Sequence, residues 1–104
     1  MKAFQFHAEL LEHRGTALQI LMDREYAWLV DFGSVDVMHD LYGLEICAIR
    51  ERRDARHIAR LMMAAFPAWK NVRTYYEDHN GGEFGWKVII SREAETWDDC
   101  WKRK

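Results

Sequence analysis

The stretch DARHIARLMMAAF (residues 54–66), followed by NVRTYYEDHNGGEFGWKVIIS (residues 71–91), decides the fold of this chain. The first part predicts a helix, because its apolar side chains recur at steps of three and four residues and so share one face. Asp54 is placed to cap this helix, since its carboxylate can accept free amide protons of the first turn. Pro67 ends the helix, because the residue before a proline is disfavoured in the α conformation. The apolar face consists of Ala55, Ile58, Leu61, Met62, Ala65 and Phe66.

The second part predicts a β-hairpin, because apolar and polar side chains alternate on both sides of the glycine-containing turn around residues 80–82. A two-residue turn would pair Arg73 with Val88 and mix charges into the apolar face. A slip of one residue turns every side chain to the other face of the sheet, so we favour a three-residue loop. We expect Gly81 or Gly82 to adopt a positive φ in that loop. The pairs predicted by this register are Tyr76–Trp86, Thr74–Val88 and Val72–Ile90.

Composition indicates one domain, residues 1–104, whose core needs neither disulfides nor a metal. The chain is 49% apolar and 13% aromatic, with a single proline. No apolar run reaches the roughly 18 residues of a membrane span, and the N-terminus lacks the apolar centre of a signal peptide. Cys47 and Cys100 form no metal-like pair. We therefore expect a cytoplasmic protein with reduced cysteines.

The charges are segregated along the chain, although the net charge is only −2. Residues 1–49 carry three Lys/Arg against eight Asp/Glu, and residues 50–73 carry seven against two. Residues 74–101 carry two against seven, and the last three residues are all basic. One basic block therefore lies between two acidic blocks.

The remaining elements have weaker signals. Residues 3–14 fit a helix or a strand, and good helix formers with Gly15 as the C-terminal cap favour the helix. Alternation predicts strands at 18–22 and 26–32. Residues 33–43 are expected to form a loop or short helix, and residues 44–49 a strand covered on both faces. Residues 93–102 predict a last helix that Ser91 can cap.

The expected order is α-β-β-β-α-β-β-α, in which the first element could also be a strand. This is an α+β fold: a single domain with a mainly antiparallel sheet of about five strands. The order resembles that of the small acidic type III secretion chaperones. The resemblance is one of architecture, without a shared sequence motif, and it implies a chaperone-like domain as one expectation.

The predicted helix at residues 54–66 carries a second, charged face. Its members recur at steps of three and four residues, on the side away from Ile58 and Met62. Planar guanidinium groups suit pairing with carboxylate or phosphate. The face is therefore either a binding surface or a solvated surface paired with the acidic blocks beside it. We call it the basic face, and it consists of Arg53, Arg56, His57 and Arg60.

Five tryptophans are many for a chain of this length. Trp28 and Trp86 fit the core of the predicted sheet by alternation. Trp97 and Trp101 lie one turn apart in the predicted last helix. They are either core residues or anchors for a partner or a second copy, since tryptophan is enriched at interface hot spots.

No catalytic, cofactor or metal site is predicted. The side chains around residues 31–40 include three carboxylates and an imidazole, but their spacing matches no known metal loop. The tripeptide at 31–33 matches the magnesium-binding tripeptide of protein kinases without the other kinase motifs. No serine lies in a nucleophile elbow, and Cys47 has no arginine or lysine beside it that would activate it. The loop residues weighed as metal ligands are Asp31, Asp36, His39 and Asp40.

The sequence thus favours a non-catalytic protein-binding module: a small inhibitor, adaptor or chaperone-like protein that binds a partner protein or forms a homodimer. The alternative is a nucleic-acid-binding protein that uses the basic face, against which the acidic remainder argues. A small enzyme is the third expectation, and no membrane partner is expected. The expected partner-binding residues are Arg53, Arg56, His57, Arg60, Trp97 and Trp101.

Overall fold

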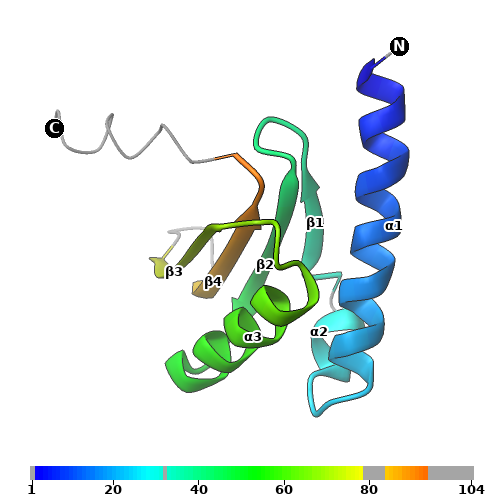
Figure 1. Ribbon diagram of the computed structural model, residues 1–104. Helices are drawn as coiled ribbons and strands as arrows, with labels where there is room; N and C mark the ends of the chain where they lie inside the picture. The colour runs from blue at the N-terminus through cyan, green and yellow to red at the C-terminus, as the bar shows by residue number, and fades with distance from the viewer. Residues whose placement is uncertain (1, 32, 79–83, 94–104) are drawn as a thin grey trace, which may run out of the picture.

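The computed structural model describes residues 2–31, 33–78 and 84–93, which form one α+β domain (Figure 1). The helices are α1 (Lys2–Met22), α2 (Ala27–Asp31) and α3 (Arg52–Ala65). The strands are β1 (Val35–Met38), β2 (Gly43–Ile49), β3 (Asn71–Asp78) and β4 (Phe84–Ser91). These four strands form a single sheet in the order β1-β2-β4-β3, and every neighbouring pair is antiparallel.

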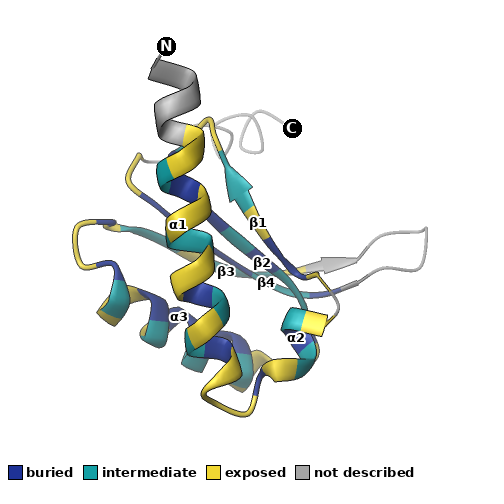
Figure 2. Ribbon diagram, turned by 90° about the vertical axis from the view of Figure 1, so that its right-hand side faces the viewer, coloured by how far each residue is buried: buried dark blue, intermediate teal, exposed yellow. Residues whose placement is uncertain are grey.

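The core lies between the sheet and the two long helices, which cover the same face of the sheet (Figure 2). Helix α1 packs on β1 and β2, and α3 packs mainly on β4 and β3. Both helices bury one apolar stripe, as amphipathic surface helices do. Completely buried residues on these helices and on the two central strands include Leu10, Ala17, Leu21, Ala55, Ile58, Met62, Leu44, Ile46, Val88 and Ile90.

Helix α3 confirms the predicted helix and its buried face. It ends at Ala65, and Phe66 is its C-cap residue, directly before Pro67. The prediction that Asp54 caps the helix is wrong, because the helix begins at Arg52 and its N-cap residue is Glu51. Asp54 lies instead in the first turn, where a carboxylate is stabilised by the positive end of the helix dipole.

The β3–β4 hairpin confirms the predicted register. Tyr76 pairs with Trp86, and the two pairs predicted further along the strands are also present. The rings of Tyr76 and Trp86 meet edge to face, with 5.5 Å between their centroids. The pairing continues to Asp78 and Phe84. The expected positive φ of Gly81 or Gly82 lies outside the described residues.

The strand predicted at residues 18–22 is wrong, because α1 continues through it to Met22. Gly15 does not cap the helix: it is exposed in the helix interior, where glycine costs about 1 kcal/mol relative to alanine. Leu10, Ala17 and Leu21 are buried at steps of seven and four residues. This helical period outweighs the short alternation of residues 18–22, because it buries a continuous stripe against the sheet.

Residues 23–43 also differ from the prediction. The strand predicted at 26–32 is a turn followed by the short helix α2, and the predicted loop at 33–43 contains strand β1. The Arg14 side chain donates a hydrogen bond to the carbonyl oxygen of Val35 at 2.7 Å and so ties β1 to α1. The described order is α-α-β-β-α-β-β with four strands. The predicted order and its five strands are therefore wrong, as is the order on which the resemblance to the secretion chaperones rested.

The strand predicted at 44–49 is confirmed as β2, a central strand that pairs with β1 and β4. Its expected cover on both faces is wrong, because both long helices lie on one face and Glu45 and Cys47 are only half-buried. A bulge interrupts its pairing with β4 between Ile46 and Ile49, and Ala48 adopts φ 61° there. Gly85 lies against this bulge with φ +146°, and a Cβ atom on it would stand 2.9 Å from the Ile49 carbonyl oxygen. Glycine is required at position 85, because both the dihedral angle and the close approach exclude a side chain.

Candidate functional site

The basic face is the exposed side of α3. Arg53, Arg56 and Arg60 are exposed, and His57 is half-buried among them. The opposite side of the helix is held against the sheet by completely buried apolar residues such as Ile58. The fold therefore presents the predicted basic face to solvent on a helix whose position is fixed by the core.

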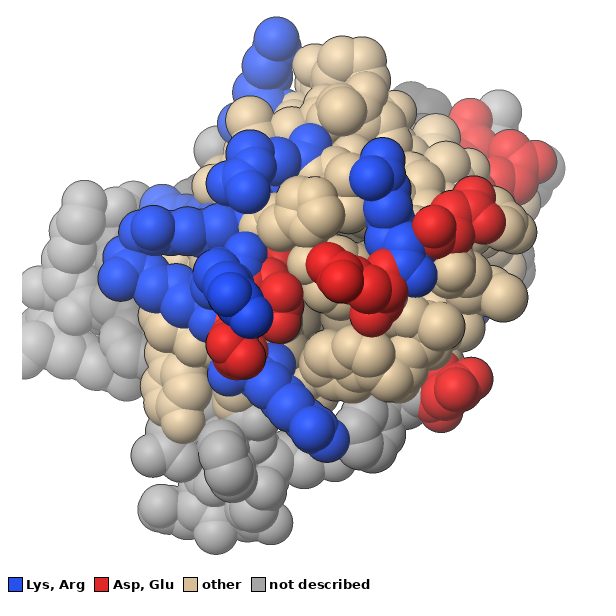
Figure 3. Space-filling view, turned by 90° about the horizontal axis from the view of Figure 1, so that it is seen from below, with Lys and Arg blue, Asp and Glu red and all other residues tan. Residues whose placement is uncertain are grey.

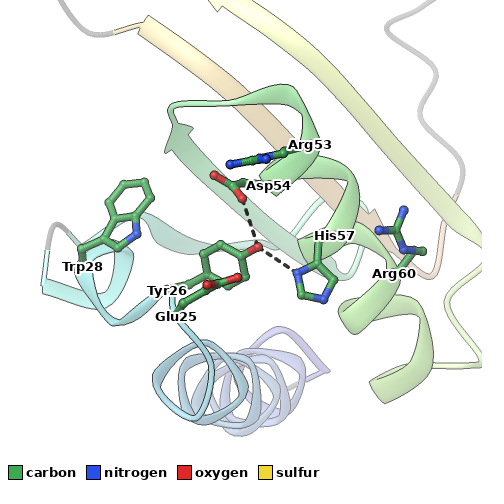
Figure 4. Close-up of a pocket in the computed structure, with 7 residues that line it drawn as sticks. All are labelled: Glu25, Tyr26, Trp28, Arg53, Asp54, His57 and Arg60. Atoms are coloured by element: carbon green, nitrogen blue, oxygen red, sulfur yellow. Dashed lines mark hydrogen bonds between the residues drawn. The ribbon is translucent and has the colours of Figure 1, made fainter.

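A hollow of about 570 Å³ opens beside the basic face, and we call it the α2–α3 hollow (Figure 4). Its walls come from segments far apart in the sequence. One wall is formed by Glu25, Tyr26 and Trp28, from the turn before α2 and from α2 itself. The other is formed by Arg53, Asp54, His57 and Arg60, from α3. Arg56 belongs to the basic face but does not line the hollow.

Tyr26 forms the floor of the hollow and is only 2% exposed. Its hydroxyl donates a hydrogen bond to Asp54 Oδ1 at 3.3 Å and lies 2.8 Å from His57 Nδ1. The turn after α1 holds Tyr26 in place, since its backbone amide donates to the Leu21 carbonyl. Tyr26 thus joins the end of α1 to the first half of α3 and fixes one ring nitrogen of His57 (Figure 4).

The Tyr26 hydroxyl remains protonated at neutral pH. Burial, the negative charge of Asp54 and the hydrogen bond to that carboxylate together raise its pKa to about 12. A protonated phenol acts as a hydrogen-bond donor and not as a nucleophile. The arginines and the imidazole that line the hollow can pair with an anion.

The arginines of the basic face are weakly engaged by the protein itself. Arg53 lies 3.7 Å from Glu51, with both side chains more than half exposed, and such a surface pair contributes about 0–1 kcal/mol. Within the described ranges, neither Arg56 nor Arg60 lies within ion-pair distance of a carboxylate. The exposed guanidinium groups are thus available to an external anion.

Positive and negative side chains are interleaved around the basic face. The view in Figure 3 shows Lys and Arg gathered on one side of this surface, with Asp and Glu between them. Two arginines beside the face rest on tryptophan rings: Arg50 lies 5.4 Å from the Trp28 ring centroid, and Arg52 lies 5.7 Å from that of Trp86. The surface therefore combines charges of both signs with aromatic rings.

A second buried tyrosine lies at the other end of the helical layer. The Tyr42 hydroxyl donates a 2.6 Å hydrogen bond to Glu9, and the Arg92 guanidinium lies 4.1 Å from the Tyr42 ring centroid. The hydrogen bond to Glu9 raises the pKa of Tyr42, and burial raises it further. The rings of His13, Phe66 and Trp69 pack against one another around Tyr42. We call this group the aromatic cluster: Glu9, His13, Tyr42, Phe66, Trp69 and Arg92.

The other predicted candidates are placed differently. Trp97 and Trp101 lie outside the described residues. Trp28 lies half-buried on α2 and not in the sheet, while Trp86 lies on β4 as expected. Among the residues that the structure describes, no three His, Cys, Asp or Glu side chains come together as a metal site would require. His39 instead stacks on His7, with 2.7 Å between facing ring nitrogens.

Sequence reasoning found the α3 wall of the hollow and missed the other wall. The alternation predicts a strand at residues 26–32, and this prediction gives no reason for Tyr26 or Trp28 to lie next to α3. Their contact depends on the turn that follows a long α1, and α1 was predicted to end at Gly15. The sequence offered one hint of this wall: two aromatic residues, Tyr26 and Trp28, follow directly after the charged run Asp23-Arg24-Glu25.

Comparison with known proteins adds no relative: no protein-family model, no curated protein and no solved structure matches this chain. Of the helices in the described part of the chain, none combines the length and apolar character needed to cross a bilayer.

Proposed function

We propose that this protein is a non-catalytic protein-binding module that docks an acidic segment of a partner protein onto the basic face of α3. The observation that carries the proposal is the exposure of Arg56 and Arg60 without a carboxylate partner in the described part of the chain. Guanidinium groups pair with carboxylates in bidentate geometry. A basic face that its own protein leaves unpaired suits an acidic partner.

Two further features support a protein partner over a nucleic acid. Glu25 and Asp54 line the hollow beside the arginines, and a row of phosphates would meet them at close range. A protein segment can place its own charges to match such an interleaved surface, and this matching governs specificity and the rate of association. The helix is also held rigidly by its buried face, which lowers the entropy lost on binding.

Charge reversal on the basic face tests the proposal. Arg56→Glu with Arg60→Glu should abolish capture of the partner from cell extract, because inverting a paired interface charge costs about 2–5 kcal/mol or more. The fold should persist, since exposed substitutions shift stability by about 0.5 kcal/mol. The matched control is Arg24→Glu with Lys70→Glu, which changes the net charge equally at exposed positions outside the face. Equal capture by the two folded double variants would contradict the proposal.

Nuclease treatment distinguishes protein binding from the second candidate function, nucleic-acid binding. Five arginines and no lysine between residues 50 and 60 favour phosphate contacts as the alternative use of this face. If capture disappears after nuclease treatment and weakens steeply with salt, the basic face binds nucleic acid. Capture that survives nuclease agrees with a protein partner.

The proposal places the module in the cytoplasm and includes homodimerisation through Trp97 and Trp101 as a separate element. Both statements derive from the sequence: two cysteines without a disulfide pattern, and two tryptophans one helical turn apart. Sedimentation of the chain and of a Trp97→Ala, Trp101→Ala variant measures the dimer directly. A concentration-dependent dimer that the variant loses is the expected result, and a monomer at all concentrations contradicts it.

A further inference from the structure

The α2–α3 hollow differs from the rest of the basic face because it has walls, a floor and a balanced charge. Two arginines and two carboxylates line it, so the hollow without His57 carries no net charge. One of the carboxylates, Asp54, accepts a hydrogen bond from Tyr26. The other, Glu25, is exposed. A ligand group in the hollow therefore meets two guanidinium groups, an imidazole and two carboxylates above the Tyr26 hydroxyl.

We propose that the α2–α3 hollow is a specificity pocket for a single carboxylate side chain, glutamate or aspartate, of the acidic partner segment. This inference rests on the proposed function and adds the identity of the group that the hollow takes. In it, Arg53 and Arg60 pair with the carboxylate oxygens, and His57 donates to the same anion from the ring nitrogen that faces away from Tyr26. Tyr26 is the positioning residue that holds the imidazole.

Charge decides between a carboxylate and a phosphate as the ligand group. Two guanidinium groups facing two carboxylates leave no surplus positive charge for a dianion. A carboxylate adds one negative charge beside Asp54 and Glu25, whereas a phosphate dianion adds two and is repelled more strongly by both. The hollow is thus better matched to a carboxylate than to a phosphorylated side chain.

The contact between Tyr26 and His57 leaves one ring nitrogen for a ligand. His57 Nδ1 lies 2.8 Å from the Tyr26 hydroxyl, so Nε2 is the nitrogen that can meet the carboxylate. Tyr26 also donates to Asp54 and so connects the two walls of the hollow. The charged and titratable groups around His57 are Glu25 and Tyr26 from the segment before α2, and Arg53, Asp54 and Arg60 from α3.

Calorimetric titration with synthetic peptides tests the pocket. The probes are a short glutamate-rich peptide, the same peptide with glutamines, and a version with phosphoserine in place of one glutamate. The glutamate peptide should bind, and the glutamine peptide should bind at least about tenfold more weakly. Arg60→Gln should weaken the glutamate peptide by about tenfold, whereas Arg56→Gln, on the basic face but outside the hollow, should weaken it by less. Arg24→Gln, at an exposed position outside both, is the matched control and should change the affinity by about twofold or less.

The outcomes separate the pocket from the function on which it rests. Equal losses in Arg60→Gln and Arg56→Gln would leave the basic face as a binding surface and overturn the pocket. No binding by either acidic peptide would overturn both. Tighter binding of the phosphoserine peptide than of the glutamate peptide would overturn the choice of a carboxylate. A folded Tyr26→Phe variant should lose part of the preference for the glutamate peptide over the glutamine peptide, and an unchanged preference would overturn the positioning role of Tyr26.

Discussion

The molecule contains two buried tyrosines that are hydrogen-bonded to carboxylates, and their surroundings differ. Tyr42 donates to Glu9 at 2.6 Å, and aromatic rings and the Arg92 guanidinium pack around it. Tyr26 donates to Asp54 at 3.3 Å, and above it lies an open hollow of about 570 Å³. The aromatic cluster is filled by the protein's own side chains, whereas the hollow leaves arginines facing solvent.

This difference separates a structural polar group from a candidate binding site. In the aromatic cluster the polar atoms find their partners within the fold, so the cluster holds α1 to the start of β2. In the hollow, the hydroxyl of Tyr26 is hydrogen-bonded within the protein, whereas the guanidinium groups above it face solvent. Buried polar groups that are fully paired rigidify a structure, and exposed guanidinium groups on a rigid floor are ready for a ligand. We therefore expect changes in the cluster to alter stability and changes at the hollow to alter binding.

The largest effect should follow Phe66→Ala in the aromatic cluster. Phe66 is 7% exposed, stacks on Trp69 and meets His13 edge to face. Loss of its ring should lower the free energy of unfolding by about 3–5 kcal/mol, through lost burial and the cavity left behind. Peptide affinity per folded molecule should stay unchanged, because the ring lies away from the hollow. Urea denaturation and titration of the same sample measure both, and a stability loss under about 1 kcal/mol would contradict the account.

Alkaline pH should weaken both tyrosine sites. Each tyrosine has a raised pKa in the folded protein, so its neutral form is favoured by folding. The unfolded tyrosines ionise near pH 10, so the contribution of the two sites to stability is complete below that pH. It declines as the pH rises toward the folded-state pKa of about 12 for Tyr26. Urea midpoints between pH 9 and 12 should fall less steeply in a Tyr26→Phe, Tyr42→Phe double variant. Parallel curves for the two proteins would count against the raised pKa values.

Removal of each hydroxyl separately compares the two sites directly. Tyr42→Phe should cost about 1.5–3 kcal/mol of stability, since it deletes a short hydrogen bond to a carboxylate. Tyr26→Phe should cost less, because its bond to Asp54 is longer, but it should weaken binding of the glutamate peptide. The reverse pattern, with binding lost in Tyr42→Phe and kept in Tyr26→Phe, would exchange the roles of the two sites.

The smallest effect concerns α1, the helix that runs between the two sites. Gly15 lies exposed in its interior, and a Cβ atom added there would meet no atom within 4 Å. Gly15→Ala should therefore stabilise the protein by about 0.5–1 kcal/mol without changing peptide affinity. Thermal unfolding measures this shift, and a destabilised variant would show that the helix is interrupted at Gly15.

The same glycine shows where prediction from the sequence succeeds and where it stops. Helix α3 and the β3–β4 hairpin follow from local patterns. A 3.6-residue period in the helix, and strict alternation around a glycine-containing turn in the hairpin, each leave one arrangement that buries the apolar side chains. At residues 16–32 the apolar residues fit both a strand and a helix, and Gly15 suggested a helix end. Only packing of Ala17 and Leu21 against the sheet decides for the helix.

The candidate site divides in the same way. Arg53, Arg56, His57 and Arg60 could be placed together from spacing, because one helix carries all four. The floor and far wall of the hollow could not, because Tyr26 reaches His57 across 31 residues of sequence, through the unexpected length of α1. A long-range contact of this kind leaves no periodic trace in the chain.

A double-mutant cycle between the protein and the peptide tests the central claim most directly. The affinities of the glutamate and glutamine peptides are measured for the unchanged protein, for Arg60→Gln and for Arg56→Gln. We predict a coupling of about 0.5–3 kcal/mol between the peptide carboxylate and Arg60, and a smaller coupling with Arg56, which lies on the basic face outside the hollow. Equal couplings for the two arginines, or none for Arg60, would contradict the claim that the α2–α3 hollow receives the carboxylate.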